Sequence, residues 1–203
     1  MKKVSFLRLI GVVMVMALVF SVVGFAQAPG ALAATTSAKI FQGPDELNTM
    51  YASNFGIYFG ADYKARNYST TNNFGTTSYY SALGAPVLDI ADYFGVNMST
   101  VNYIVFCTDD GGQVEFEITK ANNEYTGLLD PARMYWSDPN GRNNSSTFVP
   151  ATVATAEASG VNQPPSSSSN ELRLFYGQLS DDEVTNSFFA KYITEIHFNA
   201  NPL

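Results

Sequence analysis

The clearest helical period in this chain of 203 residues lies just before its middle. Apolar side chains there recur at i, i+3, i+4 and i+7, a spacing that lines one face of a helix. They are Val87, Ile90, Ala91 and Phe94. Pro86 suits the first turn of a helix and Gly95 suits its C-terminal cap. The pattern therefore predicts a helix between Pro86 and Gly95.

A hairpin is predicted directly after this helix. Residues 103–107 are apolar on both faces, which is typical of an interior strand. The run Asp-Asp-Gly-Gly at 109–112 supplies a turn, and residues 113–118 then alternate between apolar and acidic or polar side chains. A calcium loop is not expected at 109–112, because the ligand register and the terminal glutamate of such a loop are missing.

Shorter alternating runs predict further strands at 54–59, 171–176 and 191–198. Residues 63–80 are expected to form loop and short strand, with 76–80 extended. Residues 151–158 fit either a short helix or an extended segment. Strands that alternate irregularly with one or two short helices predict the α+β class, β-rich with short helices and long loops.

Three polar segments carry weaker signals. Residues 122–150 show little periodicity and are expected to form a long excursion with a turn at 138–141. Pro164 and Pro165 precede a run of serines, which predicts a flexible surface loop that is too short to be a domain boundary. Ser180 and Glu183 have the spacing of a capping box, which predicts the start of a helix. The acids at 181–183 would then complement the helix dipole.

The first 33 residues have the order of a secretory signal peptide: a basic head, an uncharged apolar stretch at 9–26 and small residues at 31–33. We expect cleavage after Ala33, because the rival site at 26–28 would place Pro29 just after the cut. An uncleaved anchor is the alternative, since 18 apolar residues approach the roughly 20 that span a bilayer. The predicted organisation is a signal peptide at 1–33 and a single domain at 34–203, secreted to the cell surface or beyond.

Charge narrows the range of partners. Removal of residues 1–33 leaves 170 residues with eight basic and eighteen acidic side chains, a net charge of −10. Such a body repels phosphate backbones and anionic lipid surfaces. We therefore expect no nucleic-acid partner and no membrane contact after signal cleavage.

The chain has one cysteine, Cys107, and one histidine, His197. An exported protein with a single cysteine forms no internal disulfide and depends on packing. Cys107 is expected to be a small core residue and His197 a surface residue. Without a cluster of histidines and cysteines, zinc and copper sites built from nitrogen and sulfur are nearly excluded. No metal site is therefore expected from the sequence.

Seven segments, taken in order, carry a family resemblance. They are Asn67–Ser69, Tyr79–Val87, Phe106–Gly112, Ala132–Trp136, Val149–Thr152, Leu172–Gln178 and Asn186–Tyr192. This succession resembles the oxidoreductase molybdopterin-binding domain, the sulfite-oxidase-like fold, and is similar to its divergent exported versions in surface proteins of Gram-positive anaerobes. The resemblance covers roughly residues 52–199.

What the resemblance implies for a cofactor is limited by one departure from the family. The family's enzymes hold molybdenum through a cysteine thiolate upstream of the helix start, but Ala34–Leu83 contains neither cysteine nor histidine. Arg66 and Arg173 stand in only partially for the side chains that clamp the pterin. Molybdopterin is therefore disfavoured and no cofactor is expected. We expect the corresponding cleft to be filled, partly by aromatic side chains of Tyr63–Tyr80.

Four residues remain as candidates for ligand binding. Tyr135 and Trp136 lie in the long excursion, and together with other tyrosines (Tyr79, Tyr80 and Tyr176) they could form an aromatic platform for a sugar or a peptide. Arg66 and Arg173 complete the set. Nothing in the sequence identifies a catalytic residue.

These observations favour a secreted, non-catalytic binding or interaction module for an extracellular ligand or surface protein. The fold alone would not carry the family's activity. One alternative is a redox protein that accepts a pterin in a degenerate pocket. Another is a carbohydrate-active hydrolase with paired acids.

Overall fold

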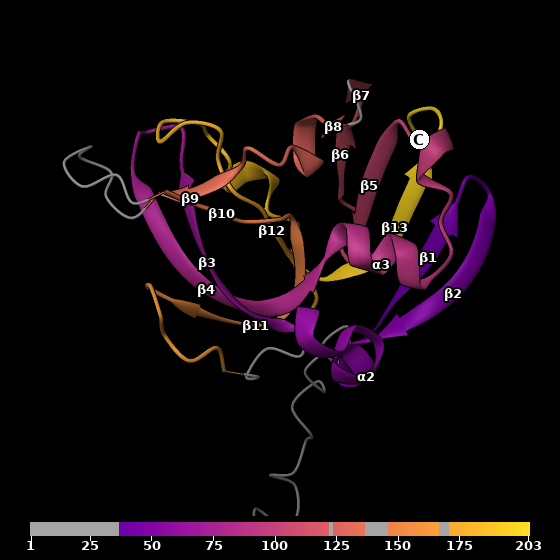
Figure 1. Ribbon diagram of the computed structural model, residues 1–203, viewed down its shortest axis with the longest axis horizontal. Helices are drawn as coiled ribbons and strands as arrows, with labels where there is room; N and C mark the ends of the chain where they lie inside the picture. Colours follow the sequence, from indigo (N-terminus) through magenta and orange to yellow (C-terminus); the bar gives the residue numbers. More distant parts are fainter. Residues whose placement is uncertain (1–36, 122–123, 137–145, 167–170) are drawn as a thin grey trace, which may run out of the picture. The chain divides into compact units, whose positions relative to one another are not determined.

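Strands dominate the described part of the protein, which a computed structural model covers at residues 37–121, 124–136, 146–166 and 171–203. A five-stranded sheet has the strand order β2-β1-β13-β5-β6 (Figure 1). Its strands are β1 (Ser37–Gln42), β2 (Asp45–Tyr51), β5 (Tyr103–Thr108), β6 (Gln113–Glu117) and β13 (Ile193–Asn199). Strands β1 and β13 run parallel, and the other neighbours are antiparallel.

A second, antiparallel sheet has the order β12-β11-β4-β3. Its strands are β3 (Lys64–Thr71), β4 (Thr77–Pro86), β11 (Thr152–Ser159) and β12 (Arg173–Phe175). Two short antiparallel pairs are β7 (Lys120–Ala121) with β8 (Glu124–Tyr125), and β9 (Met134–Trp136) with β10 (Ser146–Phe148). The β9–β10 pair lies near the outer edge of the second sheet, beside β3 (Figure 1).

The helices are short. The α-helices are α2 (Phe55–Phe59) and α3 (Val87–Tyr93). Single 3₁₀ turns are η1 (Ala52–Asn54), η2 (Gly60–Asp62), η3 (Met98–Thr100), η4 (Gly127–Leu129) and η5 (Asn186–Phe188). The fold is thus β-rich with few short helices, as the sequence predicts. Among the described residues, no helix has the length and apolar character needed to cross a membrane.

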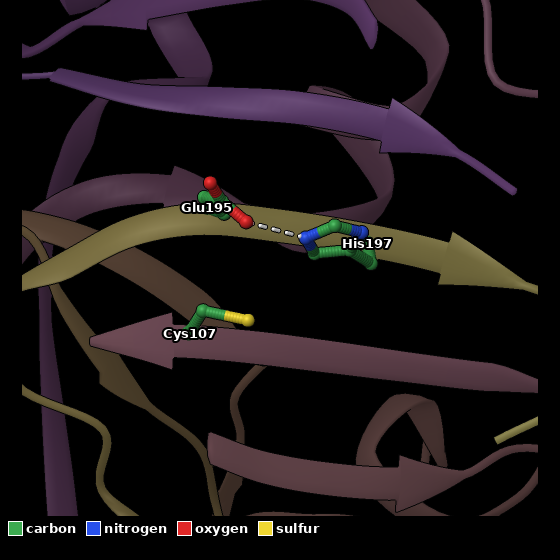
Figure 2. A group of neighbouring side chains, drawn as sticks. All are labelled: Cys107, Glu195 and His197. Atoms are coloured by element: carbon green, nitrogen blue, oxygen red, sulfur yellow. Dashed lines mark hydrogen bonds and ion pairs between the residues drawn. The ribbon is translucent and has the colours of Figure 1, made fainter. Parts of the chain in front are cut away.

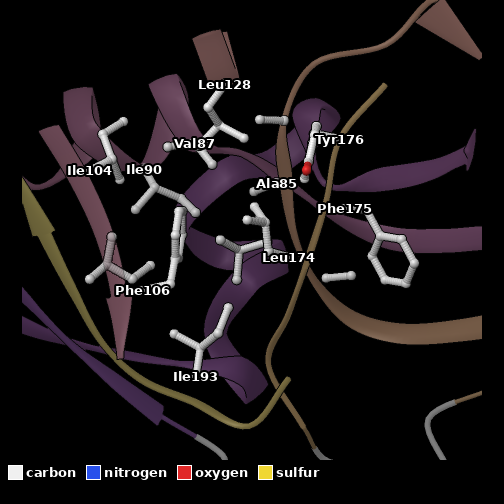
Figure 3. Packing of buried hydrophobic residues seen from close by; sticks show 14 of the residues in the cluster. Ala85, Val87, Ile90, Ile104, Phe106, Leu128, Leu174, Phe175, Tyr176 and Ile193 are labelled. Atoms are coloured by element: carbon white, nitrogen blue, oxygen red, sulfur yellow. The ribbon is translucent and has the colours of Figure 1, made fainter. Parts of the chain in front are cut away.

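The core brings both sheets and α3 together. Figure 3 shows Ile90 of α3 close to Ile104 and Phe106 of β5, with Leu174 of β12 beside them. All four side chains are fully buried. Because side chains of a strand alternate between its faces, the residues that flank these core positions on β5 point to the other side of the sheet.

The helix and the hairpin predicted from the sequence are confirmed. Pro86 precedes α3, and Gly95 after it has a φ of +74°, a left-handed conformation that glycine adopts without strain. Strands β5 and β6 pair across the Asp-Asp-Gly-Gly turn, and β5 is an interior strand. The Asp110 carboxylate accepts hydrogen bonds from the Thr108 hydroxyl and the Gly112 backbone, which lowers the pKa of Asp110.

The strand predicted at 54–59 is wrong. Phe55 and Phe59 are buried at i and i+4 on α2, while Ile57 between them is 81% exposed. Apolar residues at 55, 57 and 59 fit both periods, and packing selected the helical one because only two of the three side chains reach the core. The segment 151–158, open between helix and strand, forms β11.

Two further predictions need correction. No helix begins at Ser180, and the Glu183 carboxylate does not cap one: it accepts hydrogen bonds from the Leu179 backbone and from Arg133. The last strand begins at Ile193, because Tyr192 has a φ of +57° and lies 40% exposed before it. The predicted signal peptide, the turn at 138–141 and most of the serine run lie outside the described residues.

Candidate functional site

A groove beside β3 contains two of the four candidate residues. It has a volume of about 480 Å³ and runs between β3 and the segment that follows β10. It is lined by Lys64, Ala65, Arg66, Asn67, Tyr135, Thr147, Phe148, Val149 and Pro150. A second hollow of about 330 Å³ shares Phe148, Val149 and Pro150 as a wall and is closed on its far side by α3 and by residues 129–131. Arg66 and Tyr135, which the sequence singled out for different reasons, both line this groove.

Strand β3 presents unpaired backbone to this groove. Its inner edge pairs with β4 along the whole strand, and no described strand pairs with its outer edge between Lys64 and Asn67. Further along, the Thr71 carbonyl accepts a hydrogen bond from the Thr185 N–H at 3.1 Å, so Thr71 faces the outer edge. In an antiparallel strand the backbone N–H and C=O groups of successive residues point alternately to the two edges. The backbone groups of Ala65 and Asn67 therefore point to the outer edge of β3, as those of Thr71 do.

Two basic side chains, Lys64 and Arg66, also line the groove. Neither Lys64 nor Arg66 forms an ion pair with a carboxylate within the described ranges. The Arg66 guanidinium is held in place by backbone carbonyls instead: it donates to those of Asp62 and Gly84, each at 3.1 Å, and to that of Lys64 at 3.3 Å. Its charge is therefore fixed in position and has no direct ion-pair partner in the described part of the chain, although it interacts at longer range with Asp89.

In the adjoining hollow, Asp89 of α3 is half-buried. Burial raises the pKa of its carboxyl, and the negative charge of Asp62 adds to this effect. The wall between the two hollows is apolar, and its most exposed member is Phe148, with 66% of its surface accessible. Phe148 was not among the residues selected from the sequence. Its only sequence signal was its place in the long excursion.

The predicted aromatic platform does not form as an exposed surface. Tyr135 is buried against Tyr79, with ring centroids 6.2 Å apart, and burial raises the pKa of its hydroxyl. Trp136 is half-buried, and its indole N–H donates to the Gln178 carbonyl at 3.4 Å. Tyr176 packs in the core against Phe189. Most of these rings stabilise the fold.

Arg173 lies away from the groove. It is 9% exposed and forms an ion pair with Glu157, and its guanidinium lies over the rings of Tyr80 and Phe175, at 5.3 and 4.9 Å. The cavity that it lines has a volume of about 10 Å³. The two arginines that could have clamped a pterin therefore line separate cavities, and the one at Arg173 is filled by side chains.

A third group of residues lies on the outer face of the five-stranded sheet. Figure 2 shows Glu195 and His197 side by side on β13, with Cys107 facing them from β5. One ligand atom from each residue lies within 4.8 Å of the others. The His197 Nε2 and a Glu195 carboxylate oxygen are 2.8 Å apart.

The expectation for Cys107 is wrong, and His197 lies on the expected outer face of β13 but is less exposed than a surface residue. Cys107 is half-buried on the outer face and does not belong to the hydrophobic core, and the His197 side chain is only 12% exposed. Burial raises the pKa of the Cys107 thiol, and the Glu195 carboxylate raises it further. Counting one cysteine and one histidine gave no indication that the register of β5 against β13 places them together.

Comparisons of the chain with family models, with curated proteins and with solved structures find no match. Function is therefore inferred from the two sites themselves.

Proposed function

We propose that this chain is an exported, non-catalytic binding module that holds an extended acidic peptide segment in the β3 groove. The observation that carries the proposal is the outer edge of β3, which no described strand covers at Lys64–Asn67, next to two basic side chains without carboxylate partners among the described residues.

The backbone supplies the first part of the recognition. An exposed strand edge takes up an extended peptide as one more strand, through main-chain hydrogen bonds. Here Ala65 and Asn67 would supply these bonds, and the closed stretch at Ser69–Thr71 limits the added strand to a few residues. The groove volume, about 480 Å³, lies in the usual range for ligand sites.

Charge supplies the selectivity. The chain after residue 33 has a net charge of −10, so most of its surface repels acidic ligands. Lys64 and Arg66 make the groove an exception, and Arg66 is already oriented by three carbonyls. An acidic segment is the ligand whose charge these two side chains complement.

An apolar anchor completes the site. Phe148, Val149 and Pro150 border the groove, and Phe148 is largely exposed. Exposed aromatic side chains beside a groove often contribute much of the binding energy at an interface. We therefore expect the ligand to combine acidic side chains with an apolar residue that covers Phe148.

Export and the scaffold are part of the same proposal. The order of residues in 1–33 supports secretion. The succession of seven motifs supports a variant of the sulfite-oxidase-like fold. The lack of cysteine and histidine in Ala34–Leu83 argues against a molybdopterin cofactor held as in that family's enzymes.

The direct test is fluorescence anisotropy with labelled peptides of about six residues, a typical strand length. One peptide alternates glutamate with valine and the other alternates lysine with valine. We expect the purified protein to bind the acidic peptide and not the basic one. Binding should weaken as added salt shortens the screening length.

Two variants separate the charge from the backbone. Lys64→Glu should weaken binding of the acidic peptide about 3- to 10-fold, whereas Lys120→Glu, the same change on β7, should not. Ala65→Pro removes one outward N–H and should also weaken binding about 3- to 10-fold, whereas Ala65→Ser keeps that N–H and should bind normally. Equal binding of both peptides, or no effect of Lys64→Glu and Ala65→Pro, would refute the proposal.

A further inference from the structure

The cluster of Cys107, Glu195 and His197 lies on a different sheet from the β3 groove and shares no residue with it. We propose that these three side chains bind one divalent transition-metal ion of the zinc and cobalt type. The inference does not depend on the peptide-binding proposal.

The strand register places the three side chains on one face. Cys107 is the direct partner of Glu195 across β5 and β13, and His197 follows two residues after Glu195. Directly opposed residues in an antiparallel pair share a face, as do residues two apart in one strand. The core lies on the other face, where Ile196 and Phe198 are buried. Sheet geometry therefore brings the three together without any loop.

The chemistry of the donors selects the metal. A thiolate, an imidazole and a carboxylate are all zinc ligands, whereas calcium and magnesium prefer sets made of oxygen alone. The ligand atoms lie within 4.8 Å of one another, and tetrahedral zinc holds its ligand atoms about 3.5 Å apart, so side-chain shifts of about 1 Å would close the site. Three protein ligands leave a fourth position for water or another ligand.

The orientation of the His197 ring is fixed by its neighbours. The ring stacks on Phe41 of β1 with centroids 4.4 Å apart and planes at 2°. Its Nδ1 is buried without a hydrogen-bond partner among the described residues. A metal-bound histidine commonly donates its other ring N–H to a neighbouring acceptor; here the stacking on Phe41 orients the ring instead. The ring is thus fixed in one orientation, with Nε2 toward Glu195 and Cys107, at the expense of an unpaired nitrogen.

Metal binding conserves protons and leaves the site with no net charge. The ion displaces one proton from the Cys107 thiol, and this proton leaves to solvent. His197 binds the ion through Nε2 as a neutral imidazole that carries its ring proton on Nδ1. Thiolate and carboxylate together then neutralise the two positive charges of the ion. Glu195, whose side chain is 37% exposed, gives the ion access from solvent.

The experiment uses the purified protein without a histidine tag, first stripped with a chelator and then titrated with Co²⁺ and with Zn²⁺. We expect one Co²⁺ per chain, a near-ultraviolet absorption band from thiolate-to-cobalt charge transfer, and displacement of Co²⁺ by Zn²⁺. Zn²⁺ should also raise the melting temperature, because a ligand that binds only the folded state stabilises it.

Matched variants assign the ligands. Cys107→Ser should abolish the charge-transfer band, and His197→Gln should weaken Zn²⁺ binding by more than the roughly 10- to 100-fold typical of a lost second-shell partner. Glu117→Gln, an exposed acid on β6 of the same sheet, should bind as the unaltered protein does. Melting temperatures of the metal-free variants show whether each one folds.

Three results would overturn the proposal. They are the absence of a thiolate band in the unaltered protein at saturating Co²⁺, full Zn²⁺ affinity in a folded Cys107→Ser variant, and equal stabilisation by Ca²⁺ and Zn²⁺. None of these results concerns peptide binding, and the peptide assay does not report on the metal. Failure of either proposal is therefore recognised separately.

Discussion

Arg133 donates from one guanidinium nitrogen to both carboxylate oxygens of Glu183, each at 3.1 Å, and this pair ties the β9 strand to the loop after β12. The same guanidinium donates to the carbonyls of Gly127 and Gly177 and lies 5.1 Å from the centre of the Tyr176 ring. Arg133 is 6% exposed. The charge is buried, two of the three guanidinium nitrogens donate hydrogen bonds, and the residue positions the strand that forms one side of the β3 groove.

Replacing Arg133 should therefore destabilise the protein strongly. Arg133→Ala removes the donor to the Gly177 carbonyl and leaves the Glu183 carboxylate with only the Leu179 N–H. Breaking a buried pair typically costs about 3–5 kcal/mol, and the lower end of that range is expected here because Glu183 is partly exposed. Urea denaturation of the two proteins measures the difference. The exposed pair Lys39–Glu46 provides the control, since Lys39→Ala should leave the midpoint nearly unchanged. Similar midpoints for both variants would contradict the assignment.

Gly84 should not tolerate a larger side chain. A Cβ there would lie 2.2 Å from the Val153 carbonyl oxygen and 2.6 Å from the Ala154 Cα, both of which belong to β11. Gly84→Ala therefore forces two strands apart and should cost about 1–3 kcal/mol in the free energy of unfolding.

Gly56 is the matched control. On helix α2, a Cβ at this position would meet only Tyr63 Cδ1, at 3.8 Å. Gly56→Ala should therefore leave stability unchanged or raise it by up to about 1 kcal/mol, because alanine favours helix over glycine. The pair of variants distinguishes close strand packing from a general preference for glycine.

Asp89 should make stability depend on pH. Its pKa is raised in the folded protein, chiefly by burial, so ionisation of this carboxyl opposes folding. The penalty is present above the folded pKa and disappears as the pH falls below the unfolded value. Asp89→Asn should thus raise the melting temperature at pH 7 and have little effect near pH 3. A lower melting temperature at pH 7, relative to the exposed control Asp92→Asn, would contradict this reasoning.

Tyr68 should contribute through its hydroxyl group. Tyr68 is fully buried, and its hydroxyl donates a hydrogen bond to Thr152 Oγ1 at 2.6 Å. The same hydroxyl lies 3.1 Å from the carbonyl oxygen of Pro150, a residue that borders the groove. Burial raises the pKa of Tyr68 strongly, so this hydroxyl should stay protonated until the protein unfolds in alkali. Tyr68→Phe should cost about 0.5–1.5 kcal/mol in urea denaturation. The exposed Tyr51→Phe serves as the control and should show no loss.

Several elements follow from local sequence. Helix α3 has an apolar face, a proline at its start and a glycine after its end, and the β5–β6 hairpin has an alternating strand and a glycine turn. In these segments the residues that predict the structure lie only a few positions apart in the sequence. Packing adds to the local preference and does not compete with it.

Local sequence was insufficient where two periods fit the same residues. The alternation at 54–59 predicts a strand, but Phe55 and Phe59 also have the spacing of one helix face, and the choice depended on whether Ile57 could reach the core. Glu183 had the spacing of a helix cap, yet it forms an ion pair with Arg133, fifty residues earlier in the chain. Long-range partners of this kind leave no signal at fixed spacing.

The sequence by itself determined the β-rich class, the main helix and hairpin, and the acidic charge of the body. Only the tertiary structure decided that Arg173 pairs with Glu157, that Phe148 is exposed, and that Cys107 lies against Glu195 and His197. The reason is physical. Spacing along a chain sets which face a side chain occupies, but the register between distant strands sets which side chains it meets.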